Sequence, residues 1–324
     1  MVLVRAVCAG LRAETRNLVD LQERLERGVV ILDGGVSTLM EQKGLAMDRE
    51  VWSGTAHITH PDLVREVHQD YLAAGAEVIT ANTFATAPHV LESRGYSAEE
   101  ARKINRRAVE IAREARDNTA SSEVWIAGSM SSMPPLTRIS APATGPGIAE
   151  SYRQQAAALV EGSCDLILTE MMIDLENAAL VLDAAHATGL PVWIGFSASV
   201  NDAGEVTSYE GEVDYRDRSA GDFGVVADEA LVRGAQAAGI MHSEIRAVGP
   251  ALDVLRQRWD GPLLAYAETG RFVNPDWDFT HAASPDDYAD AAVTWVREHK
   301  ASIVGGCCGT GPDHIRALKE RLAA

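Results

Sequence analysis

Hydrophobic and polar positions along the chain follow two periods, which together predict a repeating order of strands and helices. Short apolar runs rich in β-branched residues predict buried strands, and apolar residues at every third or fourth position predict amphipathic helices. The predicted strands are residues 29–32, 78–84, 124–129, 166–170, 191–197, 239–242, 263–268 and 302–305. The predicted helices that follow them are residues 61–74, 98–118, 148–162, 175–188, 225–238, 251–259, 286–298 and 312–322.

Eight strands that each precede a helix, without a break in composition, predict one (β/α)8 TIM barrel of the α/β class. We expect a single domain over residues 1–324, in which residues 1–27 form an N-terminal extension with a short helix around residues 17–27. A doubly wound sheet is the alternative fold. In a barrel the carboxyl ends of all strands lie on one face, where such enzymes carry their active sites.

Residues whose side chains can bind a ligand or take part in a reaction follow several of these strands. They are Asp33, Asn82, Thr83, Phe84, Glu170, His242, Glu268, Cys307 and Cys308. The barrel topology therefore predicts one site assembled from distant parts of the chain. Two long polar segments, residues 131–147 and 199–222, should lie on the same face. Either segment could be a lid or an oligomer contact, and the second could equally be a disordered insertion.

The charge balance limits the classes of partner. With 29 basic and 47 acidic residues the formal net charge is −18, which argues against nucleic acid and anionic membranes. Four cysteines in 324 residues do not form a disulfide framework, which fits a reducing compartment. We therefore expect a cytoplasmic protein that binds small molecules and can form a homo-oligomer.

The adjacent residues Cys307 and Cys308 carry the most specific chemistry. They end the last apolar strand and stand among Gly305, Gly306 and Gly309. Two thiolates can hold one soft metal ion if the backbone turns at the pair, and the glycines would permit that turn. The alternative is a pair of buried apolar cysteines.

A tetrahedral zinc site that keeps one position open needs three protein ligands. The two cysteines supply two, and His242, at the end of the predicted sixth strand, is the candidate for the third. The alternative for His242 is a histidine that is only hydrogen-bonded. The other histidines are expected to be solvated or to cap helices.

The motifs of this sequence resemble the zinc-dependent homocysteine S-methyltransferase family, which includes betaine and S-methylmethionine enzymes. The resemblance covers nearly the whole chain, and the Gly-Gly-Cys-Cys-Gly segment is its specific signal. The matching segments are residues 32–35, 60–64, 80–84, 105–113, 165–170 and 305–310. The resemblance implies Zn²⁺ as cofactor and methyl transfer from a cationic sulfonium or ammonium donor to a zinc-bound thiolate. The expected acceptor is homocysteine, which gives methionine.

One position departs from the family pattern. The third zinc ligand in the family is a cysteine at the end of strand six, where this chain has His242. A neutral imidazole in place of a thiolate makes the ligand set less negative by one charge. We expect such a site to hold an incoming thiolate more firmly and to leave its sulfur less nucleophilic.

The resemblance also implies substrate-binding residues. Glu170, and Asp33 with the Gly34 and Gly35 backbone, are expected to bind the amino-acid end of homocysteine, with capping of the following helices as the alternative for both acids. Trp52 falls at a donor-side position of the family. The segment Asn82, Thr83 and Phe84, together with Glu268, completes the expected substrate-binding set.

Two other functions remain open from the sequence. Two cysteines and one histidine also hold catalytic zinc that activates water, so a hydrolase or lyase is one alternative. A barrel that has lost the metal and only binds a ligand is the other.

Overall fold

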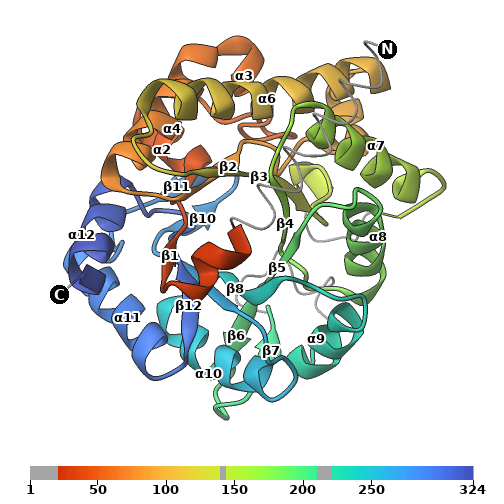
Figure 1. Cartoon of the computed structure of the whole chain (residues 1–324). Helices are drawn as coiled ribbons and strands as arrows, with labels where there is room; N and C mark the ends of the chain where they lie inside the picture. Colours follow the sequence, from red (N-terminus) through yellow and green to blue (C-terminus); the bar gives the residue numbers. More distant parts are fainter. Residues whose placement is uncertain (1–20, 139–143, 210–220, 324) are drawn as a thin grey trace, which may run out of the picture.

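The computed structural model describes residues 21–138, 144–209 and 221–323. An eight-stranded parallel sheet with the order β1-β12-β9-β8-β5-β4-β3-β2 forms a barrel surrounded by helices (Figure 1). An isolated parallel bridge between Leu32 and Val78 joins the two ends of this order. The Asp33 N–H donates to the carbonyl of Val78 over 3.0 Å there. The predicted (β/α)8 barrel is confirmed, and the doubly wound alternative is wrong.

The barrel strands and outer helices lie close to the predicted ranges. The strands are β1 (Val30–Ile31), β2 (Val78–Ala81), β3 (Trp125–Ser131), β4 (Leu166–Glu170), β5 (Val192–Phe196), β8 (Ala237–Glu244), β9 (Leu263–Glu268) and β12 (Ala301–Val304). The helices that follow are α4 (Pro61–Ala74), α6 (Ala98–Thr119), α7 (Ile148–Glu161), α8 (Leu175–His186), α9 (Phe223–Leu231), α10 (Ile245–Arg256), α11 (Pro285–Arg297) and α12 (Pro312–Ala323).

The boundaries around the sixth barrel strand differ most from the prediction. Helix α9 ends at Leu231, because Gly234 adopts a left-handed conformation with φ +87°. The alanines that were predicted to continue this helix begin β8 and pair with β5. Helix α10 begins six residues earlier than predicted and contains Pro250.

Several short elements were not predicted. They are α2 (Val36–Gln42), α3 (Ala56–Thr59), α5 (Pro88–Leu91), the 3₁₀ turns Glu92–Arg94 and Leu136–Arg138, the hairpin of β6 (Ala198–Val200) with β7 (Val206–Ser208), and the hairpin of β10 (Arg271–Val273) with β11 (Asp276–Asp278). Parts of the expected N-terminal extension and of both long loops, residues 1–20, 139–143 and 210–220, lie outside the described residues. The helix expected at the end of the extension is present over residues 21–26.

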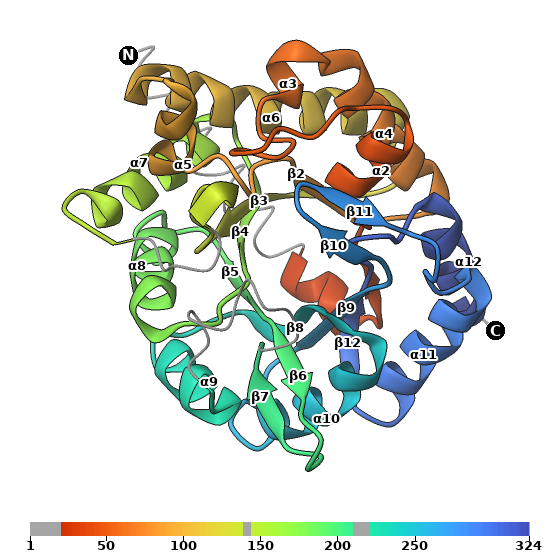
Figure 2. The same ribbon diagram turned by 180° about the vertical axis from the view of Figure 1, so that it is seen from behind.

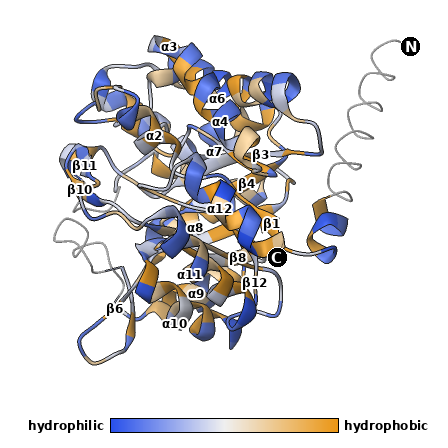
Figure 3. Ribbon diagram, turned by 90° about the vertical axis from the view of Figure 1, so that its left-hand side faces the viewer, coloured by the Kyte–Doolittle hydropathy of each residue, from blue (hydrophilic) through white to orange (hydrophobic). Residues whose placement is uncertain are grey.

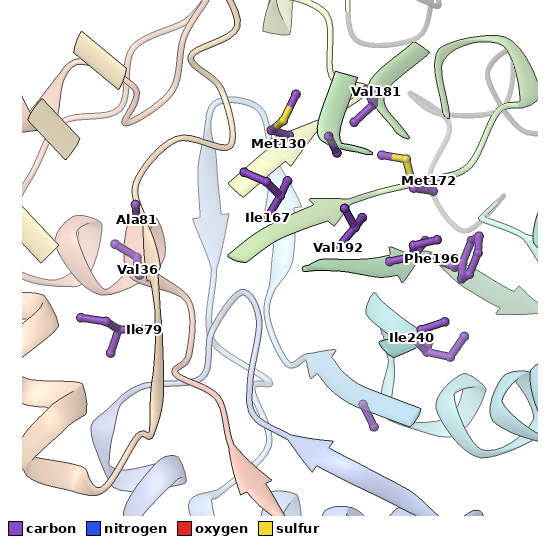
Figure 4. Close-up of a cluster of buried hydrophobic side chains, with 14 of the residues drawn as sticks. Val36, Ile79, Ala81, Met130, Ile167, Met172, Val181, Val192, Phe196 and Ile240 are labelled. Atoms are coloured by element: carbon purple, nitrogen blue, oxygen red, sulfur yellow. The ribbon is translucent and has the colours of Figure 1, made fainter. Parts of the chain in front are cut away.

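The hydrophobic core has two shells, because successive side chains of a strand point to opposite faces. Val78, Leu166 and Trp193 belong to the inner cluster. Their neighbours in sequence, such as Ile79 and Ile167, belong to the outer cluster, which packs against the helices (Figure 4). In Figure 3 the surrounding helices mix hydrophilic and hydrophobic residues, as expected of elements with one buried face. Strand parity therefore decides which side chains reach the barrel interior.

Among the described residues, no helix combines the length and the apolar character that a membrane span needs.

Two histidines contradict the expectation of solvated or capping side chains. His57 in α3 and His68 in α4 are 1% and 0% exposed. Their ring nitrogens have no hydrogen-bond partner among the described residues. Burial lowers the pKa of His57 to about 3 and that of His68 to about 4. Both side chains are therefore neutral parts of the core at physiological pH.

Replacement of His68 by leucine should make the protein lose less stability at acidic pH. The pKa of His68 is about 4 in the folded protein and 6.5 as the reference value. The unfolded chain therefore binds the proton first as the pH falls, and folding loses stability between pH 6.5 and 4. From pH 7.5 to pH 5, wild type should lose about 2 kcal/mol of unfolding free energy relative to His68→Leu. Urea denaturation at both pH values measures this difference. The control is His60→Leu at an exposed site, whose unfolding free energy should differ from that of wild type by the same amount at both pH values. If His68→Leu also differs from wild type by the same amount at both pH values, the prediction is wrong.

Candidate functional site

The two cysteines lie in a tight turn directly after β12. The N–H and the hydroxyl of Thr310 both donate to the carbonyl of Cys307, over 3.1 and 2.6 Å. Gly309 occupies a left-handed position of this turn with φ +83°, which glycine adopts without a steric penalty. The turn brings the sulfur atoms of Cys307 and Cys308 to 3.7 Å from each other. Adjacent residues thus point their sulfurs to one place, as joint coordination requires.

The neighbouring strand ends hold this turn in position. The Gly306 N–H donates to the carbonyl of Asp33 at the end of β1, and the Cys307 N–H donates to the carbonyl of Ala267 in β9, each over 2.9 Å. The approach to β1 is so close that a Cβ on Gly34 would lie 2.4 Å from the Thr310 carbonyl oxygen. No residue other than glycine fits there without movement of the backbone.

His242 reaches the same place through an irregularity in β8. The pairing of β8 with β9 shifts register between Met241 and Glu244, and His242 has a φ of +41°. By strand parity Met241 faces the barrel interior, so the next side chain would face the helices. The bulge and the left-handed backbone turn the imidazole inward instead.

The three candidate ligands form a compact triangle. The Nδ1 atom of His242 lies 3.8 Å from each of the two cysteine sulfurs. All three donor atoms lie within 4.8 Å of one another, and they form a group that could hold a metal ion. Tetrahedral coordination with bonds of about 2.0–2.3 Å places neighbouring ligand atoms about 3.6–3.8 Å apart. The described residues therefore fit three corners of a tetrahedral site.

A buried carboxylate stands beside this group. The Oε2 atom of Glu268 lies 2.9 Å from Nδ1 of His242, and both side chains are about nine-tenths buried. Burial alone would lower the pKa of His242, but Glu268 and Cys307 outweigh it and hold that pKa well above 6.5. Hydrogen bonding with Cys308, followed by the interaction with His242, lowers the pKa of Cys307 to about 6. The protein alone thus stabilises one thiolate.

Two buried acids line the cavity next to the cysteines. Asp33 accepts hydrogen bonds from the N–H and the hydroxyl of Thr80, over 2.7 and 2.8 Å. Glu170 accepts from the hydroxyls of Ser129 and Tyr266. Burial raises the pKa of Asp33 to about 7 and that of Glu170 to about 8. Near neutral pH either carboxyl can gain or lose its charge when a ligand arrives.

Neither acid caps the helix that follows it. Helix α2 starts after Gly35 without a side-chain cap. Helix α8 is capped by Asp174, whose side chain accepts from the N–H of Asn177. The capping alternative for Asp33 and Glu170 is therefore wrong.

A second part of the cavity wall is aromatic. Trp52 lies 6.3 Å from Phe84 and 6.4 Å from Trp277, measured between ring centroids. Trp277 also lies 5.4 Å from Phe272 and 5.8 Å from the imidazole of His242. Phe272 and Trp277 face each other across the β10–β11 hairpin, seen on the near side of the barrel in Figure 2. Neither residue was predicted from the sequence. The available signal was the turn dipeptide at 274–275 between two aromatic positions.

Most of the expected site residues line this one cavity. They are Asp33, Gly34, Gly35, Trp52, Asn82, Phe84, Glu170, His242, Cys307 and Cys308. Thr83 and Glu268 are not among the lining residues. Thr83 is buried and donates to the carbonyl of Ser129, and Glu268 contacts His242. Asn82 donates to the carbonyl of Ser53 over 2.9 Å, which anchors its side chain at the cavity wall.

Cys164 lies apart from the cavity lining. It is buried and precedes β4, and burial raises its pKa to about 12. This position fits a structural role. Cys8 lies outside the described residues.

Comparisons with known proteins point to one family. Residues 30–322 match the model of the family described as homocysteine S-methyltransferase. Homocysteine S-methyltransferase 3 of Arabidopsis thaliana is 28% identical, with 97% of this chain and 95% of that protein covered. Homocysteine S-methyltransferase YbgG of Bacillus subtilis is 27% identical, with 90% and 93% covered. A selenocysteine Se-methyltransferase of Brassica oleracea is 25% identical, with 98% and 96% covered.

Among solved structures, the metallated form of the homocysteine methyltransferase MmuM from Escherichia coli has a similar fold. The TM-score is 0.70 at 22% sequence identity, with 91% of this chain and 96% of that chain covered.

Substitution of His242 by alanine should lower the metal content of the protein. The change removes one of three ligand atoms and leaves two sulfurs, so we expect at least a tenfold loss of metal affinity. Elemental analysis of protein purified without chelator, followed by competition with a chromogenic chelator, measures this loss. Cys164→Ala is the matched control, because it removes a buried thiol away from the site, and it should keep the full metal content. Undiminished metal in His242→Ala would show that a different residue, such as Glu268, supplies the third ligand.

Proposed function

The chain belongs to the homocysteine S-methyltransferase family, and from this premise we propose that it transfers a methyl group from a cationic donor to the thiol of homocysteine, with Zn²⁺ as cofactor. The donor carries a sulfonium or an ammonium group, and the product of the acceptor is methionine. The observation that carries the proposal is the triangle of His242 Nδ1 and the two cysteine sulfurs in the lining of one cavity. Asp33 and Glu170 form the acidic wall of this cavity, and Trp52, Phe84, Phe272 and Trp277 form its aromatic wall.

His242, Cys307 and Cys308 would hold the zinc ion. When bound, zinc lowers the pKa of a thiol and so supplies a thiolate nucleophile at neutral pH. The histidine makes the ligand set one charge less negative than three thiolates. We expect this change to strengthen binding of the acceptor thiolate and to make its sulfur less nucleophilic.

The acidic wall fits the amino-acid end of the acceptor. The ammonium group of homocysteine can pair with Glu170 and Asp33. Its positive charge would stabilise the charged carboxylates, which burial disfavours. The Gly34–Gly35 backbone lines the cavity beside Asp33, where it can approach a carboxylate closely because glycine has no side chain. In this arrangement the thiol end of the acceptor points toward the cysteine sulfurs.

The aromatic wall fits the donor. Trp52 and its aromatic neighbours line the cavity, and the faces of aromatic rings attract cations. No lysine or arginine occurs among the lining residues of the described chain. Family membership supports methyl transfer over hydrolysis, a lyase reaction or ligand binding alone, and we do not propose those alternatives. Cytoplasmic location and a homo-oligomeric state stay predictions.

A methyl-transfer assay tests this function. The purified protein is incubated with homocysteine and, in turn, with S-methylmethionine, S-adenosylmethionine and betaine, and methionine is detected by mass spectrometry. We expect methionine with at least one donor, and its loss after treatment with a chelator and recovery with Zn²⁺. Cys308→Ser should abolish the reaction and Cys164→Ser should retain it. Absence of methionine with every donor would refute the proposal.

The raised pKa values of the two acids predict how amino-acid binding depends on pH. Norleucine has the backbone of the acceptor but no sulfur, so its binding reports on the acidic wall without titration of a thiol. At pH 6 Asp33 and Glu170 are mostly neutral, and above pH 8 both are mostly charged. Norleucine affinity should therefore rise about tenfold from pH 6 to pH 8.5.

Isothermal titration calorimetry of the zinc-loaded protein measures this pH dependence. In Glu170→Gln we expect weaker binding and a smaller rise, because one of the two titrating acids is gone. Glu176→Gln, an exposed change at the start of α8, is the control. Norleucine affinity that stays constant with pH in the wild type would contradict the role of these acids.

A further inference from the structure

The aromatic wall extends from the candidate metal ligands to the family's donor-side tryptophan through a residue of the hairpin. The ring of Trp277 contacts both the imidazole of His242, at 5.8 Å, and the ring of Trp52, at 6.4 Å between centroids. A methyl group on its way to a sulfur held by the cysteines must leave the donor in this region. Trp277 is therefore placed to contact the reacting part of the donor.

The hairpin holds this ring in a fixed place. The backbone N–H of Trp277 donates to Oε1 of Glu41 in α2 over 2.9 Å. Phe272 is its partner in the antiparallel ladder and packs on it with a centroid distance of 5.4 Å. Trp277 is only 8% exposed. Because the ring is already ordered, little conformational entropy is lost when a ligand packs on it.

Nothing on this wall can form an ion pair with a donor. The acidic lining residues are Asp33 and Glu170, which belong to the acidic wall where the acceptor is proposed to bind. Glu41 is not among the lining residues. The remaining lining residues near the rings are apolar, namely Met133, Leu136 and Met171. Among the described residues, ring faces are thus the attraction that this wall offers to a positive charge.

A wall of this kind discriminates between cations. A primary ammonium is strongly hydrated and loses that hydration without a hydrogen-bonding partner. A sulfonium or quaternary ammonium, whose charge is covered by methyl groups, loses less hydration and gains the attraction of the ring faces. A neutral group of the same shape gains only apolar burial.

We propose that Trp277 is the specificity-determining residue of the donor site, and that it selects fully alkylated onium groups over primary ammonium groups and over neutral groups of equal shape. The proposal rests on the proposed function, since it concerns the donor of that reaction. It adds a residue of the β10–β11 hairpin and a physical criterion for the donor.

The test compares a cation with its neutral isostere. Choline and 3,3-dimethylbutan-1-ol have the same shape and differ in the charge of the central atom, and ethanolamine serves as the primary ammonium. Their affinities for the zinc-loaded full chain are measured by tryptophan fluorescence and calorimetry, without an acceptor. Wild type should bind choline about tenfold more tightly than the alcohol, the ratio expected of a desolvated cation–π contact. Ethanolamine should bind more weakly than choline.

Variants of Trp277 then show whether this residue causes the preference for choline over the alcohol. Trp277→Leu should reduce the ratio of choline to alcohol affinity to about threefold or less, and Trp277→Phe should give an intermediate ratio. Trp259→Phe changes a partly buried tryptophan outside the cavity and should keep the wild-type ratio. Metal content is measured in each variant, because Trp277 also packs on His242. If Trp277→Leu does not fold, the comparison of Trp277→Phe with Trp259→Phe decides.

Three results would overturn the proposal. They are an unchanged ratio in the folded Trp277 variants, an equal loss of affinity for choline and the alcohol, and the absence of choline preference in wild type. Failure of the methyl-transfer assay with the choline preference intact would refute the transfer reaction and leave the onium site standing. Methyl transfer without any effect of Trp277 on the ratio would refute only the role of this residue.

Discussion

The contact between the end of β1 and the turn after β12 is the constraint on which the site depends. Two backbone hydrogen bonds, from Gly306 to Asp33 and from Cys307 to Ala267, fasten the cysteine turn to the strands on both sides. The turn therefore cannot move independently of the barrel. One closure of the sheet sets the positions of the two sulfurs and of Asp33 together.

Backbone conformations that are unfavourable for side-chain-bearing residues gather around the same cavity. Within the part of the chain that the structure describes, five such residues have positive φ, and Trp52, Met171 and His242 among them line the cavity. Each conformation costs on the order of 1–3 kcal/mol and persists because the surrounding barrel enforces it. For His242 the benefit is visible, since strand parity alone would direct its imidazole toward the helices. The stability of the barrel thus offsets the cost of turning a candidate metal ligand into the cavity.

Much of the architecture could be predicted from local pattern, because buried strands and amphipathic helices leave distinct periods in the sequence. The parallel order of the strands also predicted which face would carry the site, because all strand carboxyl ends lie together in a barrel. The bulge at His242 could not be predicted in this way, because a register shift arises from pairing with β9 and not from the residues of β8. Helix α9 was predicted too long for a related reason. The alanines after it have a high helix propensity, but in the fold they pair with β5 as the start of β8.

The aromatic wall was the least predictable part of the site. The strands β10 and β11 have three residues each, too few for a period to emerge. Trp52 could be identified only through the family resemblance, and Trp277 had no such match. Glu268 was recognised as a strand-end acid, but only the fold shows that it faces His242 and not the cavity.

The β10–β11 hairpin also has a consequence for how such an enzyme can diversify. The acidic wall and the candidate metal ligands lie on or beside the barrel strands, where a change of one residue disturbs several others. Among the described residues, the two strands of the hairpin pair only with each other, so mutations in it leave the barrel ladder intact. On the function proposed above, a substitution in the hairpin therefore changes the surface that meets the donor and leaves the acceptor side as it is. The donor and acceptor halves of such a site can then vary separately in evolution.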